Sequence, residues 1–572
     1  MGASWRRVFR VVCLLLVVHL GAVSVRGQET DPNDPEPIPW VNRYVFEPEQ
    51  STILQTGGFA GVHWTYVVEG QFILEVDPNA GIASFAHIDA NAVDETEPLR
   101  ILDPNDAFNL MGLSGTVVDD TTIEFAGQAA NETTVRLRLT FRDDNVHLTG
   151  ETIPPPNSAD FFILTLDAIA ERKYAGGTGE PNHPYQIATP EQMNQIGLHE
   201  EDWDKHFQLT ADIDLGLFDG QEGRPAFNII APDLDPNSWD FQGVSFTGVF
   251  DGDDCTILNL SHECNDSFLA GGLTAIGLFG SVADPNAEIR NVRLADPNID
   301  APTAWNVGAL VGWLVDGTVD NCAVDGGVVS GSTFVGGLIG QIGSHSSGES
   351  FAIAAVTDSS SIARVIGRDV VGGLAGGNFG DVVRCFARVD VGGIRWVGGL
   401  LGCNKRGSVI ECHSTGHVVG VRGVGGLFGT AGTCNCLCIS GSVAWDCYSN
   451  ASVQGDSLVG GLIGSHTWGW LRRCYSYGEV TGVESVGGLI GAIDIKRTGS
   501  AAASFWDTET SGQSVSAAGT GLTTTEMQTA DTFLGVGWDF VGETENGTED
   551  IWWIDEGRDY PRLWWENAGV EF

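Results

Sequence analysis

The sequence predicts an all-β protein built around a parallel β-helix, a solenoid of stacked coils, preceded by a small β-sandwich-like domain and accompanied by short capping helices. The main observation is a six-residue phrase, Val-Gly-Gly-Leu-Ile-Gly, which occurs seven times with small changes. Its first glycines lie at 308, 336, 372, 398, 425, 460 and 487, so the steps are 28, 36, 26, 27, 35 and 27 residues. A period in this range is typical of a solenoid, and two glycines per unit disfavour helical repeats.

A second recurring position supports the solenoid. A cysteine lies 13 or 14 residues before the first glycine of the next phrase in five units, and Ser359 takes the place 13 residues before Gly372. The cysteines are Cys322, Cys385, Cys412, Cys447 and Cys474. Because the units share one register, these residues should stack about 4.8 Å apart. We expect an inward ladder of small apolar residues; disulfides between coils are within reach but less favoured, since parallel side chains do not point at one another.

The first residues have the features of an export signal. Arg6, Arg7 and Arg10 precede an apolar run at 11–20. Residues 1–27 therefore read as a secretory signal peptide, and the run is short for a membrane span. Residues 28–39 form an acidic, proline-rich linker. We expect an exported protein without a transmembrane segment.

Residues 40–172 are expected to form the N-terminal β domain. The clearest strand is Val135–Phe141, in which apolar and polar residues alternate. Such alternation is typical of a strand with one buried face. A domain of this size with several such strands matches a β-sandwich.

The solenoid itself is expected at 173–504. A helix should begin after Thr189, which is followed by proline and by a glutamine three residues on, and should end at Gly197. A second helix should begin at Thr523, with Glu526 three residues later, and continue toward Leu534. Residues 505–572 form a tryptophan-rich cap that should close the open end of the solenoid. Its aromatic residues are Trp538, Trp552, Trp553, Tyr560, Trp564 and Trp565.

The formal net charge is -46, from 75 acidic and 29 basic residues. Such a surface repels nucleic acid and anionic membranes. The negative charge would suit the binding of calcium, the single cofactor that we consider, although the solubility of the protein is a simpler explanation for this charge. Strongly acidic polysaccharides are less expected as partners unless calcium bridges them.

Several phrases resemble the GLUG-motif proteins, a repeat family of secreted and surface bacterial proteins. Besides the glycine phrase, they are Tyr185-Gln186-Ile187, Ala211–Leu215, Phe246–Gly252, Ser504–Asp507 and Asp559–Trp564. The similarity covers roughly 174–565. It implies a right-handed β-helix at the bacterial cell exterior, and it transfers no catalytic residue because the family has no assigned activity. Two features depart from the family pattern, namely Cys255 and a Cys-x-Cys-x-Cys insertion.

The search for catalytic chemistry gives weak candidates. His199-Glu200 begins a zinc-protease phrase, but Trp203 stands where the second histidine belongs, so the zinc reading fails. Glycoside hydrolysis needs two carboxyl groups across the scissile bond. The acidic candidates are Asp251, Asp253 and Asp254, joined from neighbouring coils by Asp316 or Asp320. They indicate either a catalytic or calcium-binding patch or a solvated turn, and we favour the turn.

The cysteines outside the ladder leave three alternatives open. Three lie in the insertion, where thiolates could hold a metal together with Cys403 or Cys447. Disulfides or inert thiols are favoured over metal in an exported protein. Cys255 and Cys264 could pair across a turn. The insertion cysteines are Cys434, Cys436 and Cys438.

Binding is expected where the period breaks or where aromatic rings are exposed. The long steps mark insertions at 341–350 and 431–440, and loops on a rigid scaffold often bind ligands. Tryptophans near the coils could stack on sugars or pack at corners. They are Trp396, Trp445, Trp468 and Trp470.

Together these observations predict an exported, non-enzymatic repeat protein for adhesion or recognition at the bacterial cell exterior, with a protein or glycan ligand. The alternatives are a polysaccharide-active β-helix enzyme that uses an acidic coil face and a purely structural surface spacer. We expect no catalytic, cofactor or metal residue, calcium aside, and no nucleic-acid partner. Oligomeric state and ligand identity stay open.

Overall fold

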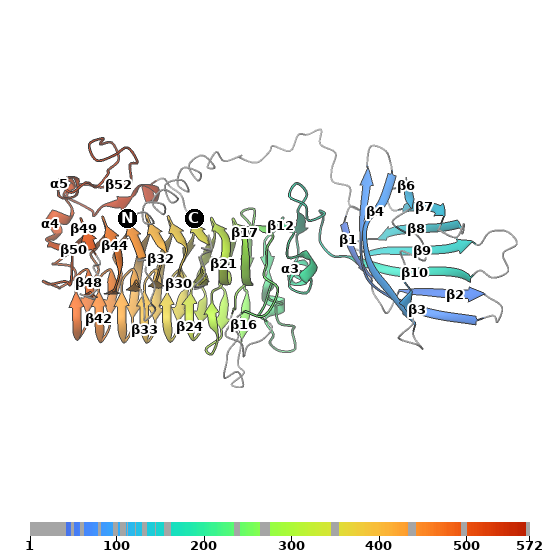
Figure 1. Ribbon diagram of the computed structural model, residues 1–572, viewed down its shortest axis with the longest axis horizontal. Helices are drawn as coiled ribbons and strands as arrows, with labels where there is room; N and C mark the ends of the chain where they lie inside the picture. Colours follow the sequence, from blue (N-terminus) through green and yellow to red (C-terminus); the bar gives the residue numbers. More distant parts are fainter. Residues whose placement is uncertain are drawn as a thin grey trace. The chain divides into compact units, whose positions relative to one another are not determined.

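The chain divides into two compact units, residues 1–171 and 172–572, each with its own hydrophobic core (Figure 1). The structure is a computed structural model. It describes residues 42–46, 51–57, 62–77, 82–94, 101–102, 110, 113–119, 122–128, 134–142, 145–153, 162–233, 241–263, 275–344, 354–432, 442–493 and 500–567. The predicted signal peptide and linker lie outside the described residues.

The first unit is a ten-stranded antiparallel sheet that closes on itself. β3 pairs with β2 on one side and with β4 on the other, and the remaining strands connect β2 to β4 in a continuous order. The predicted all-β domain is confirmed, and its strands form one hydrogen-bonded sheet rather than the two of a sandwich. The strands are β1 (Asn42–Phe46), β2 (Thr52–Gly57), β3 (Val62–Asp77), β4 (Ile82–Asp94), β5 (Ile101–Leu102), β6 (Ser114–Asp119), β7 (Thr122–Gln128), β8 (Thr134–Arg142), β9 (Asn145–Ile153) and β10 (Phe162–Arg172).

The core of this unit follows the alternation of its strands. In β8, Val135, Leu137 and Leu139 are buried, whereas Arg136 and Arg138 are exposed. Successive side chains of a strand point to opposite faces, so one face of each strand faces the interior of the closed sheet. The strand predicted at Val135–Phe141 is confirmed.

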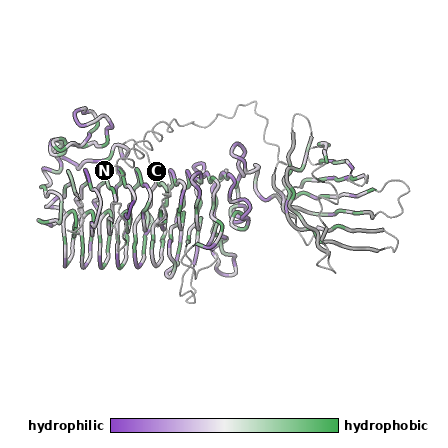
Figure 2. Tube along the Cα trace, in the orientation of Figure 1, coloured by the Kyte–Doolittle hydropathy of each residue, from purple (hydrophilic) through white to green (hydrophobic). Residues whose placement is uncertain are grey.

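The second unit is a parallel β-helix with three parallel sheets, as predicted. Sheet 1 has 17 strands from β11 (Tyr185–Ile187) to β49 (Ser500–Ala502), and sheet 2 has 17 strands from β13 (Ile213–Asp214) to β51 (Thr520–Leu522). Figure 2 shows hydrophobic residues recurring along the successive coils. Sheet 3 has seven strands: β20 (Trp305–Val307), β24 (Thr333–Gly336), β29 (Asp369–Gly372), β33 (Arg395–Gly398), β37 (Arg422–Gly425), β42 (Ser457–Gly460) and β47 (Glu484–Gly487).

One coil shows the path of the chain. It runs through β29 in sheet 3, then through two strands of sheet 1, then through one strand of sheet 2, before β33 begins the next coil. Three corners join the sheets. The phrase corner, between sheets 3 and 1, is named after the repeated glycine phrase. The cysteine corner, between sheets 1 and 2, is named after the cysteine ladder, and the arginine corner, between sheets 2 and 3, after the arginines described below. The three strands after β29 are β30 (Ala375–Asn378), β31 (Asp381–Val383) and β32 (Phe386–Gly392).

The repeated phrase forms the phrase corner. Val397 and Gly398 end β33, and Leu401 begins β34 (Leu401–Asn404) of sheet 1. Val397, Leu400 and Leu401 are fully buried. A Cβ on Gly398 would lie 2.0 Å from the carbonyl oxygen of Leu401. Glycine is therefore required because backbone atoms of the same turn occupy the space of a side chain.

Both predicted helix starts are confirmed. In α3 (Pro190–Ile196) the side chain of Thr189 accepts a hydrogen bond from the Gln192 backbone, and the helix ends at Gly197. Thr523 and Glu526 form the expected reciprocal cap of α4 (Thr524–Met527). The helix does not continue unbroken toward Leu534, because α4 ends at Met527 and a separate helix, α5 (Ala530–Leu534), follows it. The rest of the chain to residue 567 contains β52 (Trp552–Trp553), β53 (Arg562–Leu563) and the 3-10 turn η5 (Trp564–Asn567).

The C-terminal segment, residues 523–567, lies along the outer face of sheet 2. Trp538 and Trp552 are fully buried against Tyr448 and Tyr475, and Phe505 belongs to the same core cluster. Figure 1 shows the segment beside the last coils. The sequence predicted a lid over the open end; the structure places these rings on the side of the coils, where they cover an outward row.

Candidate functional site

The acidic residues considered as catalytic or calcium-binding candidates lie in ion pairs, hydrogen bonds and turns. Asp251 ends β14 (Val249–Asp251) in sheet 1 and accepts hydrogen bonds from Arg290 Nε at 2.8 Å and Asn291 Nδ2 at 2.9 Å. The strand register places Asp251, Arg290 and Asp320 in successive coils. The guanidinium of Arg290 therefore comes from the coil between the two carboxylates and binds the carboxylate of Asp251, whereas a hydrolase needs two carboxyl groups that face the scissile bond.

The other acidic residues do not join this row. Asp253 and Asp254 have positive φ values of 47° and 60° and form the tight turn after β14. Asp253 accepts a hydrogen bond from Gln208 Nε2 at 3.1 Å. Asp316 pairs in register with Ala283, outside the row of Asp251. In the described part of the chain, no group of three His, Cys, Asp or Glu side chains is placed to hold a metal ion.

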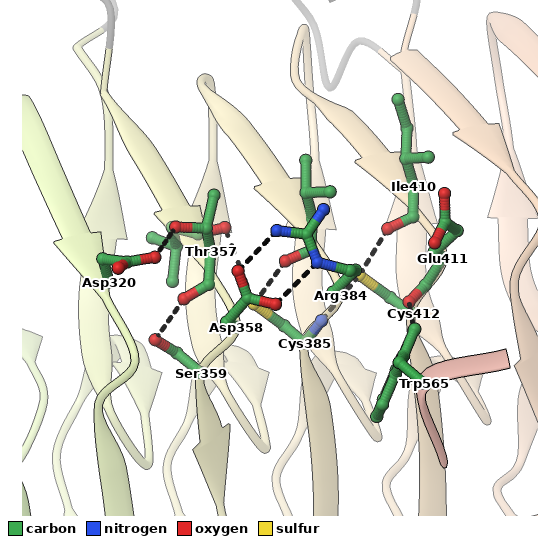
Figure 3. A network of polar contacts seen from close by, with 12 residues as sticks. Asp320, Thr357, Asp358, Ser359, Arg384, Cys385, Ile410, Glu411, Cys412 and Trp565 are labelled. Carbon is green, nitrogen blue, oxygen red and sulfur yellow. Dashed lines mark hydrogen bonds and ion pairs between the residues drawn. The ribbon is translucent and has the colours of Figure 1, made fainter. Parts of the chain in front are cut away.

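The cysteine ladder lies inside the cysteine corner, as predicted. Cys385 is fully buried, and its Sγ lies 3.2 Å from the carbonyl oxygen of Val383, two residues earlier (Figure 3). Ser359 Oγ donates in the same way to Thr357 at 2.7 Å. The position thus needs a small side chain that can donate to this carbonyl. The other buried cysteines of the ladder make the same contact: Cys322, Cys412, Cys447 and Cys474.

The five ladder cysteines have free thiols and form no disulfides between coils. Burial raises the pKa of the Cys385 and Cys447 thiols well above the usual value, which keeps them protonated and unreactive. Cys255 is partly exposed and unpaired, whereas Cys264 lies outside the described residues. The insertion cysteines Cys434, Cys436 and Cys438 lie outside them too, so their metal or disulfide chemistry stays a prediction.

A row of charged residues forms the outer side of the cysteine corner. Arg384 Nε donates to Asp358 at 2.6 Å (Figure 3). Arg473 Nε donates to Asp446 at 2.6 Å. Glu411 lies in the coil between these two ion pairs. Each of the five residues has a φ of about 50°, the left-handed region. The repeated turn therefore fixes the direction of one side chain per coil. Two Asp–Arg ion pairs form along the row, and the acidic Glu411 lies next to the acidic Asp446 between them.

Glu411 is buried beneath the C-terminal segment. Trp564 Nε1 donates to Glu411 Oε2 at 2.9 Å, and Trp565 Nε1 donates to the Glu411 carbonyl at 3.3 Å. Burial, together with the smaller effect of the nearby Asp446 charge, raises the pKa of Glu411 to about 7. Trp552 Nε1 donates to Asp446 at 3.1 Å. The segment is thus fixed to the coils by indole donors on two acceptor carboxylates.

Beside this corner, aromatic rings stack on the outer face of sheet 2. His413 lies between Phe386 and Tyr448, with ring centroids 5.3 and 4.9 Å apart and nearly parallel planes. Tyr475 continues the stack at 5.1 Å from Tyr448. Trp565 covers His413 at 5.3 Å. Because the C-terminal segment covers these rings, they contribute to its attachment and are not a free sugar platform.

Of the four tryptophans considered for sugar stacking, Trp470 has the exposed ring, with 60% of its surface accessible. Trp396, Trp445 and Trp468 are each partly buried. The ring of Trp396 lies over Gly423, where a Cβ would come within 2.2 Å of it. Packing at a corner therefore explains Trp396.

Both insertions leave the coil at the same bend of sheet 1. The first follows β25 (Ile339–Ile342) and the second follows β38 (Phe428–Ala431), which are equivalent strands of their coils. Residues 345–353 and 433–441 lie outside the described part. The proposal that these loops bind ligands therefore stays a prediction.

The arginine corner is the surface that sequence reasoning missed. Arg368 and Ile394 lie at the corner in successive coils, and Arg395 and Arg422 begin the adjacent strands of sheet 3. All four side chains are exposed. The signal was in the sequence: residues 359–445 contain eight basic and four acidic residues, in a chain of net charge -46. The strongly negative net charge of the whole chain concealed this local excess of basic residues.

Fold and surface define an all-β repeat protein, a parallel β-helix with an acidic exterior and one basic corner. Halomucin of Haloquadratum walsbyi (strain DSM 16790 / HBSQ001) is 30% identical to it over 239 residues, which are 38% of this chain and 2% of halomucin. The chain thus spans a small fraction of that relative. No protein-family model matches the sequence, and no solved structure matches it significantly. No helix among the described residues has the length and apolar character of a membrane span.

Proposed function

We propose that the protein is an exported recognition or adhesion protein of the cell exterior, without enzymatic activity of its own, and that it binds a protein or glycan ligand through the outer faces of its coils. The arginine corner carries the proposal. It is an exposed surface on a rigid scaffold, and its charge is opposite to that of the chain as a whole. In-register coils repeat such a surface at fixed spacing, which favours many weak contacts in parallel.

Two further observations support this proposal. The carboxylates that a hydrolase would need are bound to Arg290, Asn291 and Gln208. The similarity to halomucin, although it covers a small part of that protein, is compatible with a place at the cell surface.

The test is incubation of the full-length protein with panels of polysaccharides and extracellular proteins, with and without calcium. Binding and the release of reducing ends are measured on the same samples. Binding without release is the expected result. Release of reducing ends would establish the polysaccharide-active enzyme instead, and absence of binding in both panels would favour a structural spacer.

A further inference from the structure

The arginine corner is assembled from three coils. Along the corner itself the successive residues are Arg368, Ile394 and Val421. The backbone amide of each residue donates to the carbonyl of the residue that precedes it in this row. Ser332 precedes these residues in the row and Asp456 follows them, before the row continues to the exposed Val483. The arginine and the two aliphatic residues thus lie in three successive coils between two polar positions.

The adjacent rows add further arginines to the same surface. Three strands of sheet 3 begin with Asp369, Arg395 and Arg422, and these residues lie in register in successive coils. Arg395 binds Asp369 through two hydrogen bonds of 2.6 and 2.8 Å. Arg422 has no ion pair within the described ranges, and its side chain is exposed. Arg368 also lies near this carboxylate, with its Nε 3.7 Å from Asp369. Asp369 is therefore shared by Arg368 and Arg395, and Arg422 is left without an acidic partner among the described residues.

Sheet 2 extends the surface on the other side of the corner. Arg364 and Arg388 point outward from β28 (Arg364–Ile366) and β32, and neither forms an ion pair with a described residue. Asp390 is the exposed acidic residue among them. Apolar side chains lie between the arginines, with Ile394 47% and Val419 48% exposed. The surface combines unpaired guanidinium groups with exposed aliphatic groups.

The charge of the whole chain does not cancel this surface in salt solution. Interactions between exposed charges are screened beyond a Debye length, about 8 Å at 0.15 M ionic strength. Three coils spaced by about 4.8 Å already exceed that distance. The sign of the local charge therefore decides which groups make contact at the corner, whereas the net charge of -46 acts mainly at low salt.

We propose, building on the recognition function above, that the arginine corner binds a linear anionic polysaccharide. Arginine forks pair with carboxylate or sulfate groups through two parallel hydrogen bonds. The coil spacing is close to the length of one pyranose unit in an extended chain, so successive sugars meet successive coils. Ile394 and Val421 offer aliphatic contacts to the apolar faces of the rings between the anionic groups.

An acidic polypeptide fits this surface less well. Peptides commonly bind to sheets by adding a strand to a free edge. Here each coil of sheets 2 and 3 is hydrogen-bonded to the coils before and after it, so the side of the solenoid has no edge that could accept a strand. Side chains alone are available, and their spacing follows the coils rather than the residues of a strand.

The experiment measures binding of full-length protein to four polymers at 0.15 M NaCl: alginate (uronate), dextran sulfate, neutral dextran and poly-glutamate. The variant is Arg368→Ser/Arg422→Ser, because Ser332 and Ser457 occupy the same rows in neighbouring coils, which makes the serines compatible with the fold. The control is Arg472→Ser, which removes an exposed arginine from sheet 1. Thermal unfolding verifies that all variants are folded.

Alginate or dextran sulfate should bind the wild type and Arg472→Ser equally and the double variant at least tenfold more weakly, with the two polymers distinguishing carboxylate from sulfate. Stronger binding of poly-glutamate would assign the corner to an acidic polypeptide and overturn the proposal. Equal binding of neutral dextran, or binding that is unaffected by the double substitution, would also overturn it, while leaving the recognition function in place. Failure of all four polymers to bind would reject the anionic glycan, and the protein panel would then decide the proposed function.

Discussion

At the scale of single residues, two positions in each coil adopt left-handed backbone. One lies at the cysteine corner and one lies directly before the repeated phrase, where Val370 has a φ of 58° and Trp396 one of 57°. Such values are unfavourable for branched or bulky residues. They persist because the neighbouring coils hydrogen-bond the same turn above and below. The residues at these positions vary, so no sequence pattern marks them.

The cysteine ladder leads to a prediction about thiol reactivity. In native protein, Cys322, Cys385 and Cys447 should resist iodoacetamide because they are buried, and burial raises the pKa of each thiol. Cys255 is partly exposed and should react, although burial and the charge of Asp212 raise its pKa and slow it. Peptide mapping after native and denatured labelling measures both. Native labelling of the ladder would show that the corner is open.

At the scale of the elements, the corners restrict the sequence more than the strands do. The strands tolerate Val, Ile, Leu, Ala or Phe at inward positions, since the interior needs apolar volume. The phrase corner admits glycine because backbone atoms lie where a Cβ would be. This explains why the glycines, and not the strand residues, made the repeat visible.

We predict that Gly398→Ala and Gly392→Ala differ sharply in stability. A Cβ at Gly398 would meet the Leu401 carbonyl oxygen at 2.0 Å and the Gly429 amide at 2.7 Å, whereas nothing lies within 4 Å of one at Gly392. Gly398→Ala should lose several kcal/mol or fail to fold, in the range of severe core mutations (about 4 kcal/mol or more). Gly392→Ala should be close to neutral. Denaturant unfolding of the two variants compares them, and equal stabilities would contradict the close-approach explanation.

At the scale of the whole molecule, the C-terminal segment couples stability to pH through two buried groups. The folded state raises the pKa of Glu411 from 4.5 to about 7 by burial. It therefore favours the protonated acid, and this contribution is full below pH 4.5 and is lost as the pH rises to about 7. Burial lowers the pKa of His413 from 6.5 to about 3. That contribution is full above pH 6.5 and is lost as the pH falls toward 3.

Attachment of the segment should consequently be strongest at mildly acidic pH. Glu411→Gln keeps an acceptor for Trp564 and removes the charge, so it should stabilise the protein at pH 8 relative to wild type and change little at pH 4. The shift corresponds to at most roughly 3 kcal/mol. Thermal unfolding at both pH values measures it.

The control for this experiment is Asp390→Asn, which removes an exposed charge from sheet 2. It should not reproduce the difference between the two pH values. If Glu411→Gln behaved like this control, the carboxyl of Glu411 would be ionised and well solvated in the folded protein, contrary to its place beneath Trp564.

Much of the fold was predictable from sequence because the solenoid is locally encoded. The glycine phrase, the cysteine position and the helix caps each act within a few residues, so they predicted the stacked coils, the inward ladder and the starts of both helices. The N-terminal domain was predictable as a class only. Alternation shows which face of a strand is buried, but strand order depends on contacts between residues far apart in the sequence, and these close the sheet on itself.

The surfaces were decided by the tertiary structure. Residues one coil apart are some 27 positions apart in the sequence yet neighbours in space, so the ion pair between Asp358 and Arg384, the stack on His413 and the attachment of Trp564 to Glu411 depend on the register of the coils. The arginine corner arises in the same way. The sequence by itself determined that the chain winds into coils, because repeated local rules suffice for that; which side chains meet on their outer faces was settled only when the coils stacked.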